Sequence, residues 1–163
     1  MITIEQRLAQ LEQQVGELQA ALALRTLLSQ YAIAVDDKRP ELLRTLFADN
    51  ARVRIPAWQV EVVGIDAVMA FYSEYWARFE QPRRYFANDD TRIVGDTAKV
   101  FMYWHVTQER GTSSVLGWGS YDWDLVRNQG QWRIAAVLIS IRAMTTLDAG
   151  WAGERKFTDV PLG

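Results

Sequence analysis

The chain has 163 residues, of which 49% are hydrophobic and 23% are charged, and its formal net charge at pH 7 is −2. These values fit one globular domain with a sizeable core, and the small net charge gives no reason to expect nucleic acid or a membrane surface as a partner. The absence of cysteine excludes thiolate chemistry and suits a cytoplasmic location, and the single histidine excludes a metal site built from several histidines.

The N-terminus lacks the pattern of a signal peptide, and no apolar run approaches the roughly 20 residues that cross a bilayer. The N-terminal sequence instead predicts an amphipathic helix with a narrow apolar stripe. The residues of this stripe recur at alternating steps of four and three. Such an a/d pattern over about three heptads is typical of two packed helices. We interpret residues 1–22 as an arm that joins copies of the chain into a homodimer or higher homo-oligomer; the alternative is a helix lying back across its own domain. The stripe consists of Ile4, Leu8, Leu11, Val15, Leu18 and Leu22.

The apolar surface broadens after Ala21, as expected for a helix that enters a core, and the segment 36–40 ends it. A second helix is predicted over 40–48, a turn at Asp49 and Asn50, and a third helix from Gly64 onward. Alternating segments and turn residues predict six strands. They cover residues 51–55, 59–63, 84–94, 97–109, 114–127 and 131–143.

This order of elements predicts an α+β fold. We expect a cone-shaped barrel in which three N-terminal helices pack in a strongly curved antiparallel sheet, with the heptad helix as an extension. The open mouth of such a cone is a natural site for a small ligand.

Residues 24–55 (with Tyr31 and Asp36), 64–68, 95–98 and 132–134 follow one another in an order that resembles the nuclear transport factor 2-like superfamily, in its SnoaL-like branch. Scytalone dehydratase, ketosteroid isomerase and bile-acid 7α-dehydratase belong to that superfamily. The resemblance implies a cone domain over residues 23–145, followed by an extended tail over 146–163. It also implies proton transfer or binding inside an apolar pocket, without metal or organic cofactor.

Asp36 is the strongest candidate for a catalytic group. It lies near the end of a predicted helix, where the helix dipole disfavours an anion, and a carboxylate placed against that preference often has another role. The resemblance implies a catalytic aspartate at this position, which we interpret as a general base. The alternative is a surface carboxylate that pairs with Lys38 or Arg39.

Two further residues are predicted beside Asp36. Tyr31 is a candidate hydrogen-bond donor, although ~140° of helix rotation separates it from Asp36, and the alternative is a core tyrosine. Arg84 stands where the resembling dehydratases have a histidine, counted from Asn88. An arginine stays protonated and cannot act as a base near neutral pH, but it can hold an oxyanion or form an ion pair with Asp36.

His105 is the one histidine that could replace the missing base, so it is also a candidate catalytic residue. Strand parity tells against it, because His105 shares a face with Lys99 and Thr107 rather than with the apolar residues. The alternative is a histidine on the surface or at a dimer interface. On the next strand, one register turns Tyr121 and Trp123 inward and the other turns Asp124 inward; the sequence leaves both open.

Aromatic residues are the expected walls of the pocket, although any one of them could simply fill the core. We interpret the chain as an enzyme that catalyses cofactor-independent proton transfer (a dehydratase, isomerase or cyclase) on a small, cyclic, apolar molecule. The alternative is a non-catalytic domain that binds a small ligand or stabilises a partner, as the small subunit of an oxygenase does. The expected wall residues are Trp58, Phe71, Tyr75, Trp104, Tyr121 and Trp123.

Overall fold

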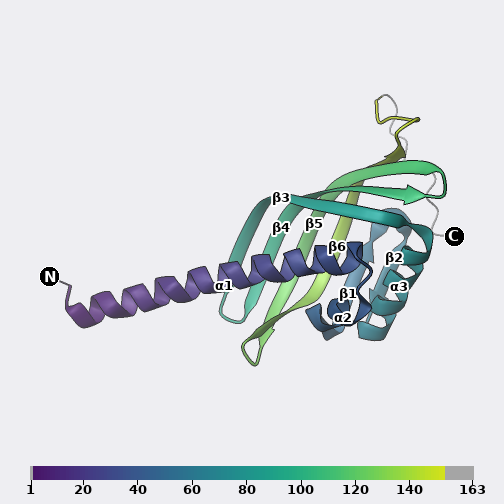
Figure 1. Cartoon of the computed structure of the whole chain (residues 1–163). Coiled ribbons are helices and arrows are strands. Elements are labelled where there is room, and N and C mark those ends of the chain that lie inside the picture. Colours follow the sequence, from purple (N-terminus) through teal and green to yellow (C-terminus); the bar gives the residue numbers. More distant parts are fainter. Residues whose placement is uncertain (1, 153–163) are drawn as a thin grey trace.

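A computed structural model describes residues 2–152 of the protein, which form a six-stranded sheet with three helices packed against it (Figure 1). This confirms the α+β class. The elements in chain order are α1 (Ile4–Asp36), α2 (Pro40–Leu46), β1 (Phe47–Ile55), the single-turn 3-10 helix η1 (Pro56–Trp58), β2 (Val60–Val63), α3 (Ile65–Arg78), β3 (Glu80–Val94), β4 (Thr97–Arg110), β5 (Ser113–Asn128) and β6 (Gln131–Thr146).

The strands lie in the order β2-β1-β6-β5-β4-β3. Every neighbouring pair is antiparallel except β1 and β6, which run parallel, with Val53 opposite Val137. The expectation of a purely antiparallel sheet was therefore wrong at this pair. β1 pairs with the edge of β6 that β5 does not occupy. The direction of β1 depends on the position at which α2 ends, and not on any residue pattern within β1. The strong curvature expected of the sheet stays a prediction.

The four long strands begin and end within a few residues of their predicted limits. The first strand differs, because β1 starts at Phe47 and includes Asp49 and Asn50, which were expected to form a turn. The pairing of β1 with β6 is irregular between Phe47 and Arg52, so these polar residues are accommodated in a distorted strand.

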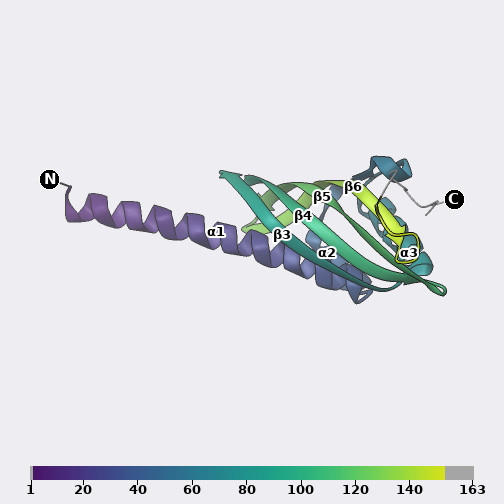
Figure 2. The same ribbon diagram turned by 90° about the horizontal axis from the view of Figure 1, so that it is seen from above.

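α1 is one continuous helix of 33 residues that begins with a capping box formed by Thr3 and Gln6. Its first part extends beyond the sheet, and its second part packs against it (Figures 1 and 2). α1 is long and apolar enough to cross a membrane, by length and composition only. Its apolar residues also have a role inside the domain, where seven of them are buried. These are Ala20, Leu24, Leu27, Leu28, Tyr31, Ala34 and Val35.

The predicted tail lies only partly within the described residues. β6 ends at Thr146, and Thr145 Oγ1 donates a hydrogen bond to the carbonyl oxygen of Gly150 at 2.7 Å. Residues 147–152 therefore include a turn held against the end of β6, and residues 153–163 lie outside the described part of the chain.

Candidate functional site

The C-terminal end of α1 carries the first residues of the site and is held in place by α3. Trp76 Nε1 donates a hydrogen bond to the carbonyl oxygen of Val35 at 2.8 Å, and Lys38 Nζ donates to the carbonyl oxygen of Trp76 at 2.9 Å. These contacts satisfy a carbonyl group of the last helical turn and fix the direction in which Asp36 leaves the helix.

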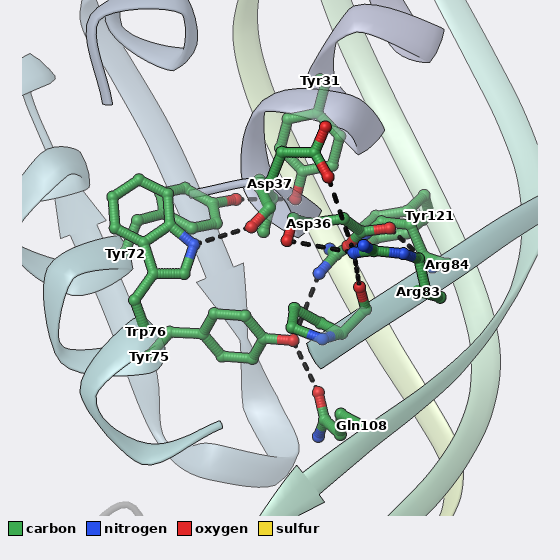
Figure 3. Close-up of polar contacts among 12 residues, drawn as sticks. Tyr31, Asp36, Asp37, Tyr72, Tyr75, Trp76, Arg83, Arg84, Gln108 and Tyr121 are labelled. Atoms are coloured by element: carbon green, nitrogen blue, oxygen red, sulfur yellow. Dashed lines mark hydrogen bonds and ion pairs between the residues drawn. The ribbon is translucent and has the colours of Figure 1, made fainter. Parts of the chain in front are cut away.

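Asp36 is bound by Arg84 of β3 at two points (Figure 3). The Arg84 backbone N–H donates to Asp36 Oδ2 at 2.7 Å, and Arg84 Nε donates to Asp36 Oδ1 at 2.6 Å. Only 8% of the Asp36 side chain and 7% of the Arg84 side chain are exposed to solvent. The carboxylate therefore pairs with Arg84, as one of the sequence-based alternatives proposed, and not with Lys38 or Arg39.

The other end of the Arg84 guanidinium reaches the tyrosines of the pocket. Nη2 donates to the Tyr75 hydroxyl at 3.2 Å and Nη1 donates to the Tyr121 hydroxyl at 3.3 Å. Burial by itself lowers the pKa of Arg84, but its interactions with Tyr75, Tyr121, Tyr31 and Asp36 outweigh this and raise the pKa above its usual value. Arg84 is thus a permanent cation at the pocket wall.

Tyr31, like Asp36, lies beside Arg84. The Tyr31 ring centroid lies 5.9 Å from Arg84 Cζ, and its hydroxyl shares a hydrogen bond of 2.7 Å with the hydroxyl of Tyr72. Burial, together with the neighbouring Tyr121 and Tyr72, raises the pKa of Tyr31 well above its usual value. Tyr31 therefore stays protonated near neutral pH, which suits a donor and not a base.

Gln108 of β4 completes the polar part of the site, and the sequence analysis missed it. The Tyr75 hydroxyl donates to Gln108 Oε1 at 2.6 Å, whereas Gln108 Nε2 has no hydrogen-bond partner among the described residues. Gln108 is only 4% exposed, and it lines the pocket. A signal was present, because Gln108 continues the inward parity of Trp104 and Val106 and is the one polar residue among the buried residues of that strand.

The pocket is mainly apolar, as expected, and five of the six predicted wall residues line it. The sixth, Trp123, stacks on Tyr121 from behind, with the ring centroids 4.8 Å apart. Asp36 is not among the lining residues, because the Arg84 side chain stands between it and the cavity. The lining consists of Tyr31, Ile55, Trp58, Phe71, Tyr72, Tyr75, Arg84, Trp104, Val106, Gln108, Tyr121, Ile139, Ile141 and Met144.

The free volume of the pocket is about 40 Å³, room for at most about three water molecules. A ring-sized ligand therefore enters only if lining side chains rotate outward. Trp58 and Ile141 are only partly buried and are the apolar wall residues that can move with least loss of packing.

His105 does not join the site. Its side chain is exposed on the opposite face of the sheet, because β4 alternates without interruption from Ala98 to Gln108. The register question on β5 is also resolved: Tyr121 and Trp123 are buried, while Asp124 is exposed and pairs with Lys99 at 2.7 Å. The sequence-based argument from parity was right for His105, and its inclusion as a catalytic candidate finds no support in this geometry.

Within residues 2–152, no three side chains of His, Asp or Glu come close enough together to hold a metal ion. Apart from the indole N–H groups of its two tryptophans, the polar groups of the residues that line the pocket are a guanidinium, four phenol hydroxyls and one amide. This set consists mainly of hydrogen-bond donors, and it can stabilise an oxygen atom that carries negative charge.

Residues 16–137 match the family described as SnoaL-like domain. No curated protein matches the sequence. Several solved structures are similar in fold. The LinA Type2 hexachlorocyclohexane dehydrochlorinase is 19% identical with a TM-score of 0.77, over 82% of this chain and 93% of that one. LinA-type3 of Novosphingobium barchaimii is 19% identical with a TM-score of 0.76, and the match covers 88% of this chain and 97% of that one.

A scytalone dehydratase-like protein of Novosphingobium aromaticivorans is also 19% identical to this chain. Its TM-score is 0.73, and the match covers 79% of this chain and 88% of that one. At such identities the similarity shows the fold alone.

Proposed function

The chain belongs to the SnoaL-like domain family, and from this membership and the pocket geometry we propose that it catalyses cofactor-independent proton transfer on a small, largely apolar molecule. The observation that carries the proposal is the buried Arg84 guanidinium, which lies between Asp36 and the tyrosines of an apolar pocket. Structures of similar fold bear the names of a dehydrochlorinase and a dehydratase, which supports elimination or isomerisation as the reaction.

The donors of the pocket define how the substrate is held. An oxygen atom of the substrate accepts hydrogen bonds from Arg84 and from the free amide group of Gln108, while Tyr75 remains protonated because burial raises its pKa to about 12. When a neighbouring carbon atom loses a proton, negative charge develops on this oxygen. Fixed donors in a pocket without bulk water stabilise that charge far more than water does.

Asp36 is the proposed acceptor of the proton. Its Oδ2 is held by the Arg84 backbone, and its Oδ1 by the Arg84 side chain. A substrate oxygen that draws the guanidinium aside, out of the line between Asp36 and the cavity, opens the second bond and exposes Oδ1 to the substrate carbon, whose proton it takes. In the substrate-free arrangement Asp36 instead acts as a positioning residue for Arg84.

A second candidate function is ligand binding without turnover. The closed pair of Asp36 and Arg84 favours it, because both carboxylate oxygens are occupied and neither faces the cavity. The two functions share the pocket and differ in whether Asp36 becomes free when the ligand binds.

Cyclohexanone is a suitable probe, because it is an apolar ring with one oxygen atom and exchangeable protons on the adjacent carbon. We expect the protein to accelerate its hydrogen–deuterium exchange, followed by NMR, and the Asp36→Asn variant to lower the accelerated rate by about 100-fold or more. Asp37→Asn is the matched control: its side chain is partly exposed, does not line the pocket and pairs with Arg39 and Arg83, so exchange should be unchanged.

Binding of cyclohexanone is followed separately by tryptophan fluorescence. Binding without exchange in the unmodified protein would establish the second function instead. Full exchange activity in Asp36→Asn would show that Asp36 is not the proton acceptor.

A further inference from the structure

The apolar stripe on the first part of α1 is not covered by any described residue of the chain. Its six side chains are 43% (Leu11) to 88% (Ile4) exposed. The arm that carries them extends away from the sheet in both views (Figures 1 and 2). A regular stripe of six exposed large apolar side chains on a helix indicates a contact surface.

The stripe and the core-facing residues of α1 lie on opposite sides of the helix. At ~100° per residue, the mean direction of the stripe differs by ~180° from that of the seven buried residues of α1. Because α1 is one continuous helix whose first part extends beyond the sheet, the described part of its own domain does not cover the stripe. The alternative of an arm that lies back across its own domain is therefore wrong for this structure.

We propose that a second copy of the chain covers the stripe, in a parallel two-stranded coiled coil over residues 4–22. Leu8, Val15 and Leu22 occupy the a positions, and Ile4, Leu11 and Leu18 occupy the d positions. In the central layers, Val15 at a with Leu11 and Leu18 at d favours two strands, whereas Leu8 at a with Ile4 at d fits higher oligomers, so the choice of two strands rests on the central layers.

Charge selects the parallel orientation. Arg7 is at a g position and Glu12 at the following e position, and in a parallel pair these residues lie beside each other across the interface, once on each side. In the antiparallel pair that keeps the same apolar layers, Glu12 faces Glu12 of the second copy. The parallel pair thus gains two opposite-charge contacts, and the antiparallel pair gains one like-charge contact.

The coiled coil ends where the domain begins. The next d and a positions are the polar Arg25 and Ser29. Arg25 Nη2 already lies 3.9 Å from Asp89 Oδ1 of β3 in its own chain. Because the stripe points away from the sheet, the two domains lie on the outer sides of the paired helices. The pockets remain separate, so the inference is independent of the proposed reaction.

Cysteine cross-linking of the full chain tests the orientation, since the chain has no cysteine of its own. In the parallel pair, Leu18 faces Leu18 of the second copy, so Leu18→Cys alone should form a covalent dimer under mild oxidation. In the antiparallel pair it faces Leu8. A covalent dimer that appears only when Leu18→Cys is mixed with Leu8→Cys would overturn the parallel arrangement.

Sedimentation velocity tests the association itself. Leu11→Glu combined with Leu18→Glu should raise the dimer Kd by more than about 100-fold, because two charges from each chain enter the apolar layers. Ala9→Glu combined with Gln10→Glu adds the same charge on the outer side of the same helix and should leave the dimer intact. Near-UV circular dichroism confirms that each variant keeps its folded domain. A monomeric unmodified chain, or equal weakening by both double variants, would refute the proposal.

Discussion

At the scale of single residues, the site depends on one buried ion pair. Burying a carboxylate and a guanidinium costs solvation energy, which is offset only when their hydrogen bonds are satisfied. Asp36 and Arg84 meet this condition, because the carboxylate receives two short hydrogen bonds and the guanidinium reaches two hydroxyls as well. Removing one partner alone should therefore lower the free energy of unfolding more than removing both.

Arg84→Met should lower the free energy of unfolding by about 3–5 kcal/mol, because it leaves the Asp36 carboxylate buried and unpaired. Adding Asp36→Asn to this variant should restore most of the loss. Arg83→Met is the matched control: the Arg83 side chain is 51% exposed and its ion pair with Asp37 is worth less than about 1 kcal/mol. Urea unfolding of the four proteins measures these differences; equal losses for Arg83→Met and Arg84→Met would contradict the argument.

The buried tyrosines make a prediction for alkaline pH. Burial raises the pKa of Tyr75 from 10 to about 12 and also raises the pKa values of Tyr31 and Tyr72. A raised pKa means that the folded state keeps protons which the unfolded state loses, so the stabilisation is complete below pH 10 and is lost as the pH rises from 10 toward 12. Urea unfolding at pH 8, 10 and 11 should show this decline.

Tyr75→Phe should flatten that decline, because one of the shifted groups is removed. Tyrosinate absorbance is a second measurement. The buried Tyr31, Tyr72 and Tyr75 should ionise together with unfolding. Ionisation of these three tyrosines in the folded protein near pH 10 would contradict the prediction.

At the scale of elements, β5 is fitted closely between β4 and β6. The pairing of β5 with β6 shifts between Trp118 and Gly119. A Cβ atom on Gly119 would overlap the Ser140 carbonyl group and press on the Trp104 ring. The glycine thus permits an approach of two backbones beside the pocket wall, which no other residue allows.

Gly119→Ala should therefore lower the free energy of unfolding by about 1–3 kcal/mol or more, since backbone must move to make room. Gly117→Ala, two residues away on the same strand, is the matched comparison. Its nearest contact is the Cε atom at the end of the flexible Met144 side chain, so its effect should be smaller. Thermal unfolding of both variants checks the order; a smaller loss for Gly119→Ala would refute the account.

The elements also show what local patterns can predict. The helix over α1 and the long strands β3 to β6 were predicted because their periods of 3.6 and 2 repeat over many residues. Phe47 to Asn50 were assigned to a helix end and a turn, because turn-forming residues there outweigh the pattern of β1. Gln108 was missed because the sequence analysis followed only the apolar residues on the inward face of the strand and did not consider a polar residue at the same spacing.

At the scale of the whole molecule, the arm (residues 1–22) contributes none of its described residues to the lining of the pocket. The arm extends beyond the sheet (Figure 1), and its apolar stripe is exposed. The pocket is lined by residues of the sheet, of η1 and of the helices α1 and α3. The long helix α1 connects the arm and the pocket. Its first part carries the stripe, and its last two turns include Tyr31 and Asp36. Pairing of the arms would thus fix the position of the helix that ends at the site.

The sequence by itself determined the class of fold, the order of the main elements, the inward face of β4 and the choice of Asp36, Tyr31 and Arg84 as candidate site residues, whereas it left the inward face of β5 open. These features follow from local periodicity, turn chemistry and a family resemblance. Only the tertiary structure decided that β1 runs parallel to β6, that Gln108 faces the cavity with a free amide group, that the free volume is small, and that Arg84 occupies both oxygens of Asp36. Each of these depends on contacts between residues far apart in the chain, such as the 48 positions between Asp36 and Arg84, and no local pattern records which distant groups meet.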